Sequence, residues 1–316
     1  HTEEQLHRKI AKTLRLGNQP FTYEIRKQSL DARHKEDKKF VYTVDIKVDN
    51  ESRVLKKVHD KNIMLTVERK YHFPTPGSET LSHRPVVIGS GPAGLFCAWY
   101  LAKAGYCPLV LERGEEADKR QETVENFWKN GILGTDQLVG IVQFMRHQIE
   151  EMGGEFRFRS TVTDLVVRDQ KLAAVIVNEK EEIPAEICVL APGHSARDTF
   201  SMLNKHNLSM EPKSFAVGVR VEHPQTMINQ DLYGEPENDY LGAASYKVTH
   251  TLENGRGVYS FCMCPGGYVV NASSEEGMLA VNGMSYHARD SRNANSAIIV
   301  TVNPSDFPEE GVLGGI

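Results

Sequence analysis

The stretch PVVIGSGPAGLFCAWYLAKAGYCPLVLERG, residues 85–114, decides the fold. Its apolar runs at residues 86–88 and 109–111 predict two short buried strands. Residues 93–104 between them are typical of a helix, and Gly105 is placed to end it. A strand, a glycine turn, a helix and a second strand form the repeating unit of a doubly wound sheet. We therefore expect the two strands to be parallel neighbours with a right-handed crossover.

The glycines of the first turn predict a site for a dinucleotide. Gly89 would permit the tight turn, Gly91 would let a pyrophosphate approach the backbone, and Gly94 would let the helix pack closely. Pro92 suits the first helical position, where no N–H is needed. With Ala93 it forms the helix start, whose unpaired N–H groups and positive dipole end favour phosphate.

Glu112 ends the second strand and completes this pattern. It lies 23 residues after Gly89, close to the ~20 expected for an acid that binds an adenosine ribose. Its carboxylate could accept hydrogen bonds from both ribose hydroxyls and would repel a 2′-phosphate. The alternative is a glycine-rich turn without a ligand, which the complete strand–helix–strand context disfavours. The spacing by itself does not separate FAD from NAD.

The length and composition of the chain indicate its class of protein and its number of domains. The chain has 316 residues, of which 40% are hydrophobic and 25% charged, as expected for two or three globular domains. No apolar run reaches the ~18 residues of a membrane span, and no signal-peptide pattern is visible. The chain starts at His1 rather than Met, so we expect its natural start to lie outside it. Five widely spaced cysteines argue against a disulfide framework and predict a cytoplasmic protein.

The first 84 residues carry a net charge of +6 and the remainder −11, which suggests separate domains. We predict a small α+β domain over residues 1–76, with the order α-β-β-α-β. Its helices would contain residues 6–14 and 54–58, and its strands residues 21–25, 40–48 and 63–67. The stretch FPTPGSETLSHRP would follow as a linker.

A basic loop, DARHKEDKK, joins the first two of these strands. One interpretation is a contact with nucleic acid through Arg33, Lys35, Lys38 and Lys39. Because two acidic residues interrupt the loop, we favour a solvated hairpin tip and expect no nucleic-acid partner.

The next section predicts a helix and a set of strands. Residues 136–152 place apolar side chains on one helical face. TDLVV and AAVIV flank the polar turn RDQK, which indicates a hairpin. A further buried strand at residues 187–190 ends in Ala191, Pro192 and Gly193.

This arrangement resembles the FAD-binding domain of the glutathione-reductase-like flavoproteins with two dinucleotide-binding domains. In that superfamily a β-meander follows the acid-ended strand, and a later strand closes with an Ala-x-Gly signature, matched here by VLAPGHSARD. Together with SFAVGVRVEHPQ and YSFCMCPGGYVVNASSE, the chain resembles the uncharacterised FAD-dependent dehydrogenases over nearly its whole length. The resemblance, not the spacing, implies FAD rather than NAD.

The resemblance also implies the roles of further residues. Ala191 and Gly193 would close the nucleotide pocket, and the backbone of Val162 would hydrogen-bond adenine. Arg113 would lie over the adenine or its ribose, with a solvated arginine as the alternative. The implied fold is α/β, with a Rossmann-like FAD-binding domain and β-meander over residues 84–200. A mixed α+β substrate domain would occupy residues 201–316.

Two departures from the family pattern concern the flavin ring. The family's long glycine-rich flavin-binding segment is missing near residues 132–135, where ENFWKNGILGTDQLV passes from one helix to the next. The family's last strand and glycine-rich helix start would lie beyond Ile316. We expect the chain to represent parts of a longer protein, with its substrate domain truncated at the C-terminal end; a relative that truly lacks these segments is the alternative.

The last domain contains Cys262 and Cys264 in YSFCMCPGG. In a regular strand the two would share one face, and we interpret them as packing residues, with a redox dithiol as the alternative. A metal site would usually need a second pair of cysteines elsewhere, and the sequence contains none. His194, His223 and His287 could act as acids or bases, but the sequence assigns no catalytic residue.

We therefore predict an FAD-dependent oxidoreductase that transfers a hydride through its flavin, with an unknown small-molecule substrate or electron donor. No membrane partner is expected. The alternatives are a nucleic-acid-binding flavoprotein that uses the basic first domain and a flavin-binding protein without turnover.

Overall fold

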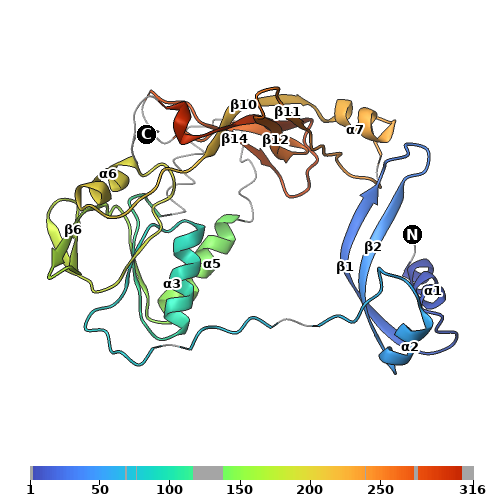
Figure 1. The fold of residues 1–316 in the computed structure, drawn as a ribbon, viewed down its shortest axis with the longest axis horizontal. Coiled ribbons are helices and arrows are strands. Elements are labelled where there is room, and N and C mark those ends of the chain that lie inside the picture. The colour runs from blue at the N-terminus through green and yellow to red at the C-terminus, as the bar shows by residue number, and fades with distance from the viewer. Residues whose placement is uncertain are drawn as a thin grey trace. The chain divides into compact units, whose positions relative to one another are not determined.

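A computed structural model describes residues 3–67, 70–75, 77–116, 138–238, 240–273 and 277–307. The chain divides into two compact units (Figure 1). One comprises His1–Thr75 with Asp231–Gly234, and the other comprises Pro76–Gln230 with Glu235–Ile316. In the described ranges, no helix combines the length and apolar character needed to cross a membrane.

The first unit contains a hairpin and two helices. Its elements are α1 (Glu3–Thr13), β1 (Phe21–Asp31), β2 (Lys39–Val48) and α2 (Glu51–Lys57). The two strands are antiparallel and pair Phe21 with Val48 at the open end. The helices contribute Ile10 and Val54 to a small core, and Leu14 just after α1 joins them, as expected from the apolar spacing.

The prediction of a strand at residues 63–67 is wrong. The segment has no regular secondary structure, although Ile63 packs against the small core. Leu65 and Val67 are 55% and 76% exposed. Alternating apolar residues do not by themselves secure a pairing partner, and among the described residues of this unit β1 and β2 pair only with each other.

A four-stranded parallel sheet forms the centre of the nucleotide-binding region in the second unit. Its order is β5-β4-β3-β9, and its strands are β3 (Val86–Ile88), β4 (Leu109–Leu111), β5 (Glu155–Arg157) and β9 (Cys188–Leu190). The helices α3 (Pro92–Lys103) and α5 (Leu138–Glu151) cover one face. The predicted parallel pairing of residues 86–88 with 109–111 is confirmed.

The other face of this sheet is covered by an antiparallel meander, so the region has three layers (Figure 1). The meander comprises β6 (Val162–Arg168), β7 (Lys171–Val177) and β8 (Glu181–Pro184). Alternate residues of the parallel strands point to opposite faces: Val86 and Ile88 face the meander, whereas Val87 faces the helices. After β9 the chain forms α6 (Arg197–Lys205).

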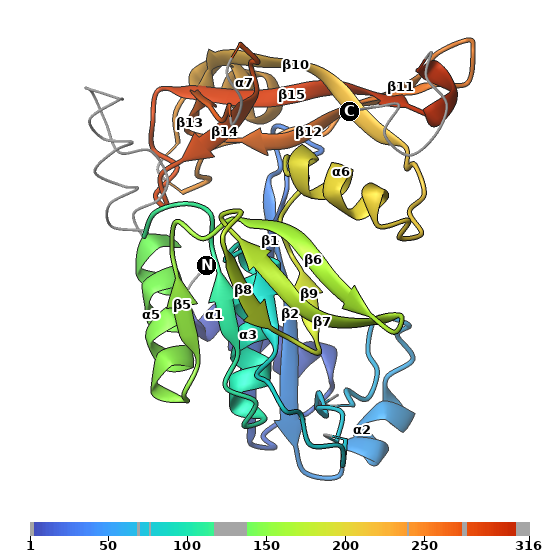
Figure 2. The ribbon, with the colours of Figure 1, turned by 90° about the vertical axis from the view of Figure 1, so that its left-hand side faces the viewer.

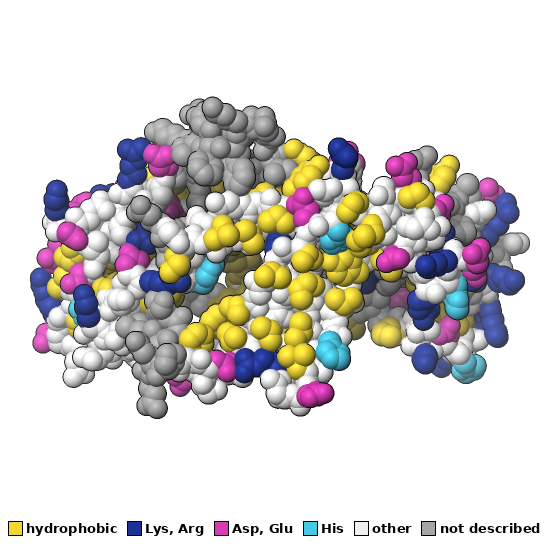
Figure 3. Space-filling view, turned by 90° about the horizontal axis from the view of Figure 1, so that it is seen from above, with side chains coloured by type: hydrophobic (Ala, Val, Ile, Leu, Met, Phe, Trp, Pro, Cys, Tyr) yellow, Lys and Arg dark blue, Asp and Glu magenta, His cyan; other side chains and the backbone are white. Residues whose placement is uncertain are grey.

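The remaining strands form a second, antiparallel sheet with the order β10-β15-β12-β11. Its strands are β10 (Phe215–Pro224), β11 (Thr249–Thr251), β12 (Gly257–Cys264) and β15 (Asn293–Val302). The helix α7 (Gln225–Tyr233) follows β10. A hairpin of β13 (Gly267–Asn271) and β14 (Val281–Ser285) packs against β10, β12 and β15 (Figure 2). Hydrophobic side chains gather over the sheet (Figure 3), where Val219 is 66% exposed.

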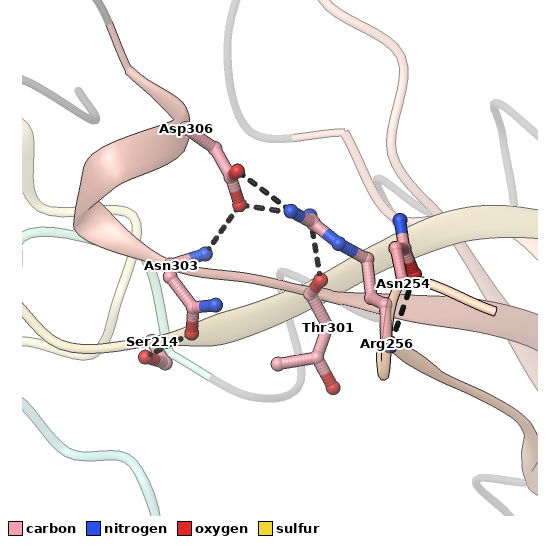
Figure 4. Close-up of polar contacts among 6 residues, drawn as sticks. All are labelled: Ser214, Asn254, Arg256, Thr301, Asn303 and Asp306. Carbon is pink, nitrogen blue, oxygen red and sulfur yellow. Dashed lines mark hydrogen bonds and ion pairs between the residues drawn. The ribbon is translucent and has the colours of Figure 1, made fainter. Parts of the chain in front are cut away.

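A polar cluster centred on Arg256 closes one end of this sheet (Figure 4). Arg256 donates to both carboxylate oxygens of Asp306, at 2.8 and 2.7 Å, and to the Thr301 carbonyl oxygen at 3.0 Å. The backbone N–H of Asn303 donates to the same carboxylate at 2.7 Å. The short helix η1 (Pro304–Asp306) is thereby fixed to the turn that precedes β12.

We expect the contribution of Asp306 to stability to disappear in acid. Arg256 lowers the pKa of Asp306 from 3.8 to about 2 in the folded protein. A lowered folded-state pKa stabilises the protein above the unfolded value and loses that effect as the pH falls through the folded value. Asp306→Asn should therefore lower the Tm above about pH 4, and the difference from wild type should shrink as the pH falls through about 2. Thermal melts over this range test it, with the exposed loop residue Asp290→Asn as control; a pH-independent difference would contradict it.

Candidate nucleotide-binding site

The predicted nucleotide-binding residues lie at the carboxyl edge of the parallel sheet. The glycine turn follows β3, Glu112 follows β4, and Ala191 follows β9. Because β3 pairs in parallel with both β4 and β9, these three strand ends lie side by side. Ligands of open α/β sheets bind at such an edge, in the crevice outside the carboxyl ends of the strands.

Two of the three glycines are required by the packing of the turn itself. Gly89 has a φ of +98°, and a Cβ added to it would lie 2.3 Å from the carbonyl oxygen of Ala191. A Cβ added to Gly94 would lie 1.9 Å from the carbonyl oxygen of Gly89. The backbone N–H of Ala191 also donates to Ile88 at 2.9 Å. Gly89 and Gly94 therefore allow β3, α3 and the end of β9 to meet closely.

Gly91 is different because an added Cβ would have no neighbour within 4 Å. It is the N-cap of α3, with Pro92 at the helix start, and no side chain caps the first turn. The N–H groups of that turn have no acceptor within their own helix. The open space over Gly91, next to these donors and the positive end of the helix, fits a pyrophosphate.

The carboxylate of Glu112 is held against the glycine turn. Oε2 accepts hydrogen bonds from the backbone N–H and the hydroxyl of Ser90, at 2.8 and 2.7 Å. Oε1 accepts one from the N–H of Gly114 at 2.7 Å. These hydrogen bonds order the turn, and the contact of Glu112 with a ribose stays a prediction. The spacing of the motif does not single out Ser90 or Gly114, although Ser90 is a small polar residue within the glycine motif.

Arg113 forms an ion pair with Asp198, in the first turn of α6. Its Nη1 lies 3.2 Å from Oδ1, and its Nη2 donates to Oδ2. This hydrogen bonding lowers the pKa of Asp198. The sequence placed Arg113 over adenine or in solvent and did not foresee the pair, which joins the end of β4 to α6.

The two remaining predicted positions are also at this edge. Val162 is the first residue of β6 and has its side chain in the core, at 5% exposure. Just before it, Ser160 donates its N–H to the Glu112 carbonyl oxygen at 2.9 Å, so the start of β6 lies beside the acid. Gly193 has a φ of +80° and open space at its Cα. The adenine contact of the Val162 backbone stays a prediction.

The prediction of a regular strand around the last two cysteines is wrong. The pairing of β12 with β15 is irregular between Phe261 and Cys264, and Cys262 has a φ of +47°. An extra residue in one strand produces such a β-bulge, which alternation along the sequence does not reveal.

The candidate acid–base histidines do not form one site. His194 lies 3.1 Å from the Ser195 hydroxyl, and His287 is exposed. Burial lowers the pKa of His223, whose Nε2 has no partner among the described residues. The predicted gap near residues 132–135 and the C-terminal end lie outside the described residues.

Three family models match the chain. The pyridine nucleotide-disulphide oxidoreductase model matches residues 83–199. The model described as FAD-dependent protein, C-terminal domain-like, matches residues 214–316. A domain of unknown function matches residues 1–47.

The chain is 42% identical to an uncharacterised protein from Clostridium beijerinckii, over 98% of this chain and 69% of that protein. It is 31% identical to thioredoxin reductase from Aquifex aeolicus, over 52% of this chain and 51% of that enzyme. Among solved structures, Lactococcus lactis thioredoxin reductase matches with a TM-score of 0.27 and 22% identity, over 35% of this chain and 36% of that one. The extended match to the Clostridium protein, with the two oxidoreductase-type models, shows that the chain belongs to the uncharacterised FAD-dependent dehydrogenases, a family of FAD-dependent oxidoreductases.

Proposed function

We propose that the carboxyl edge of the parallel sheet binds the adenosine diphosphate half of FAD. The observation that carries this proposal is the open, uncapped start of α3 at Gly91, with the Glu112 carboxylate beside it. FAD supplies hydride transfer at N5 of its flavin when bound.

The residues of the chain bind and orient the cofactor. Gly91 leaves space for the pyrophosphate, and the first-turn N–H groups after Pro92 face it. Glu112 accepts hydrogen bonds from the ribose hydroxyls while its bonds to Ser90 keep the turn in place. Ala191 and Gly193 border the site from the end of β9.

The proposed reaction partner is a small molecule, and nucleic acid is not part of the proposal. In the basic loop, Arg33 pairs with Asp31, at 2.6 Å for the closest atoms, and Lys39 pairs with Asp37. These pairs reduce the positive charge available to phosphates. We also propose a cytoplasmic location, supported by the odd number and wide spacing of the cysteines.

Absorbance spectroscopy and intact mass of the purified protein test the cofactor. We expect the protein to carry FAD or to take it up, and to bind FMN, which lacks the adenosine, far more weakly. Because the model that matches residues 83–199 is that of the pyridine nucleotide-disulphide oxidoreductases, we propose a reduced nicotinamide as the hydride donor, and anaerobic mixing with NADH or NADPH should then bleach the flavin absorbance. Preferential binding of NAD or FMN would overturn the proposed site. Bound FAD that neither nucleotide reduces, but that dithionite does, would contradict a reduced nicotinamide as the hydride donor.

A further inference from the structure

Arg220 on β10, Asn295 on β15 and Cys264 on β12 form a polar cluster in the antiparallel sheet. Arg220 donates through Nη1 to the side-chain oxygen of Asn295 and through Nη2 to the Cys262 carbonyl oxygen, at 3.1 Å in the second case. Nη1 also lies 4.0 Å from Sγ of Cys264. Because Asn295 is completely buried, the guanidinium is fixed from one side, next to a thiol.

The bulge in β12 is what brings Cys264 to this cluster. Phe261 pairs with Ala297 and Cys264 with Asn295, so Cys262 and Met263 together oppose one residue of β15. Residues directly opposite in an antiparallel pair share a face. In an unbroken register Met263 would lie opposite Asn295, and Cys264 would point to the other face. The extra residue therefore places a thiol, rather than a thioether, beside the arginine.

The β13–β14 hairpin leaves space for the guanidinium at one glycine. A Cβ added to Gly283 would lie 1.9 Å from Nη1 of Arg220 and 2.2 Å from Oδ1 of Asn295. The cluster is thus enclosed by the sheet below it and the hairpin above it, and the hairpin fits only because residue 283 has no side chain.

The two thiols of this segment differ in exposure and lie close together. Cys262 is exposed and Cys264 is partly buried. The two cysteines are separated by one residue, and Sγ of Cys264 lies 3.4 Å from the Cys262 carbonyl oxygen. Burial raises the pKa of Cys264, and Arg220 opposes that rise. For Cys188, burial is the cause of a pKa raised to about 12.

We propose that Cys262 and Cys264 form a thiol–disulfide exchange site for an external disulfide. The thiolate is the attacking form of a cysteine, and attack requires access. Cys262 is the accessible nucleophile, and Cys264 is the resolving cysteine. Arg220 is a positioning residue that favours the thiolate of Cys264. This site is additional to the proposed flavin function and does not depend on it.

The exchange has two balanced steps. The Cys262 thiolate attacks one sulfur of the external disulfide, whose S–S bond breaks and releases one thiol. The Cys264 thiolate then attacks the Cys262 sulfur and displaces the second thiol. The two cysteines are oxidised by two electrons to a disulfide, the external disulfide is reduced to two thiols, and these thiols take up the two cysteine protons.

The test uses the full chain, reduced and then mixed anaerobically with oxidised glutathione. Intact mass and peptide mapping should show the wild type lighter by two hydrogens, with a bond between Cys262 and Cys264. Cys264→Ser should stop after the first step and retain one glutathione on Cys262. Cys262→Ser should form no bond at this segment. Cys107→Ser, which removes an exposed cysteine elsewhere, should behave as the wild type at residues 262 and 264.

Arg220 is tested by the lifetime of the mixed disulfide. Arg220→Gln should lengthen it about tenfold, the effect of one pKa unit on the thiolate fraction of Cys264. Arg220→Lys keeps the positive charge and should restore most of the rate, which a purely structural role would not require. If Arg220→Gln does not fold, as judged by circular dichroism, Cys264→Ser decides the question. A wild type that keeps glutathione on Cys262, or a Cys264→Ser protein that stays unmodified, overturns the proposal. The masses are read without flavin, so failure here is distinct from failure of the FAD site.

Discussion

Gly91→Val should abolish FAD binding in a protein that still folds. Apart from its chain neighbours, the described structure places no atom within 4 Å of a Cβ at this position, so the fold has room for a side chain here. It would instead occupy the space over the start of α3. Two charge-assisted hydrogen bonds to phosphate, each worth about 1.5–3 kcal/mol, would be lost. We expect FAD affinity to fall by more than about 100-fold, measured by fluorescence titration of the apoprotein.

The control for this variant is Gly257→Val at the start of β12. Gly257 likewise has open space at its Cα and no positive φ that would strain a side chain. It should leave FAD affinity unchanged. Tight FAD binding by a folded Gly91→Val protein would remove the glycine turn from the proposed site.

Glu112→Ala should weaken FAD binding and loosen the glycine turn. The substitution removes the acceptor for the N–H and hydroxyl of Ser90 and for the N–H of Gly114. Loss of hydrogen bonds to a charged acceptor costs about 1–3 kcal/mol, or about 5- to 150-fold in affinity. Isothermal titration with FAD measures it, and FMN should bind both proteins equally poorly.

Ser90→Ala separates the two roles of Glu112. It removes the hydroxyl hydrogen bond to Oε2 and leaves the carboxylate in place. A loss in Ser90→Ala as large as that in Glu112→Ala would assign Glu112 to ordering the turn. A much smaller loss would support direct binding of the ribose, and no loss in Glu112→Ala would exclude the residue from the site.

The nucleotide-binding edge could be predicted because its requirements are local. Gly89, Gly94 and Pro92 are fixed by the geometry of one turn and one helix start, and these needs are visible as a spacing. The Arg113–Asp198 pair joins residues 85 apart, and no periodicity relates them. The prediction of a third strand in the first unit failed for a related reason, since Leu65 and Val67 alternate correctly but alternation does not show whether another strand pairs with them.

The antiparallel sheet shows more clearly that contacts between distant residues could not be predicted from the sequence. The sequence indicated a strand through Cys262 and Cys264, but it could not show that one residue of that strand is extra. Arg220 and Asn295 are 75 residues apart, and they meet a thiol only because two strands pair on either side of β15. Contacts of this kind depend on the register between strands that are distant in the sequence. One amino-acid sequence does not reveal that register.

The bulge in β12 makes this segment sensitive to the number of residues as well as to their identity. A substitution at Met263 would leave the count unchanged, so Cys264 would stay opposite Asn295. Deletion of Met263 would remove the bulge and leave Cys264 opposite Asn295, but regular alternation would then point Cys262 to the other face. A relative one residue shorter here would retain both cysteines and the contact of the second with Arg220, but its two thiols would lie on opposite faces of the sheet and could not act as a pair. Comparisons within the family should therefore align this segment by the length between Phe261 and the following turn before matching the cysteines.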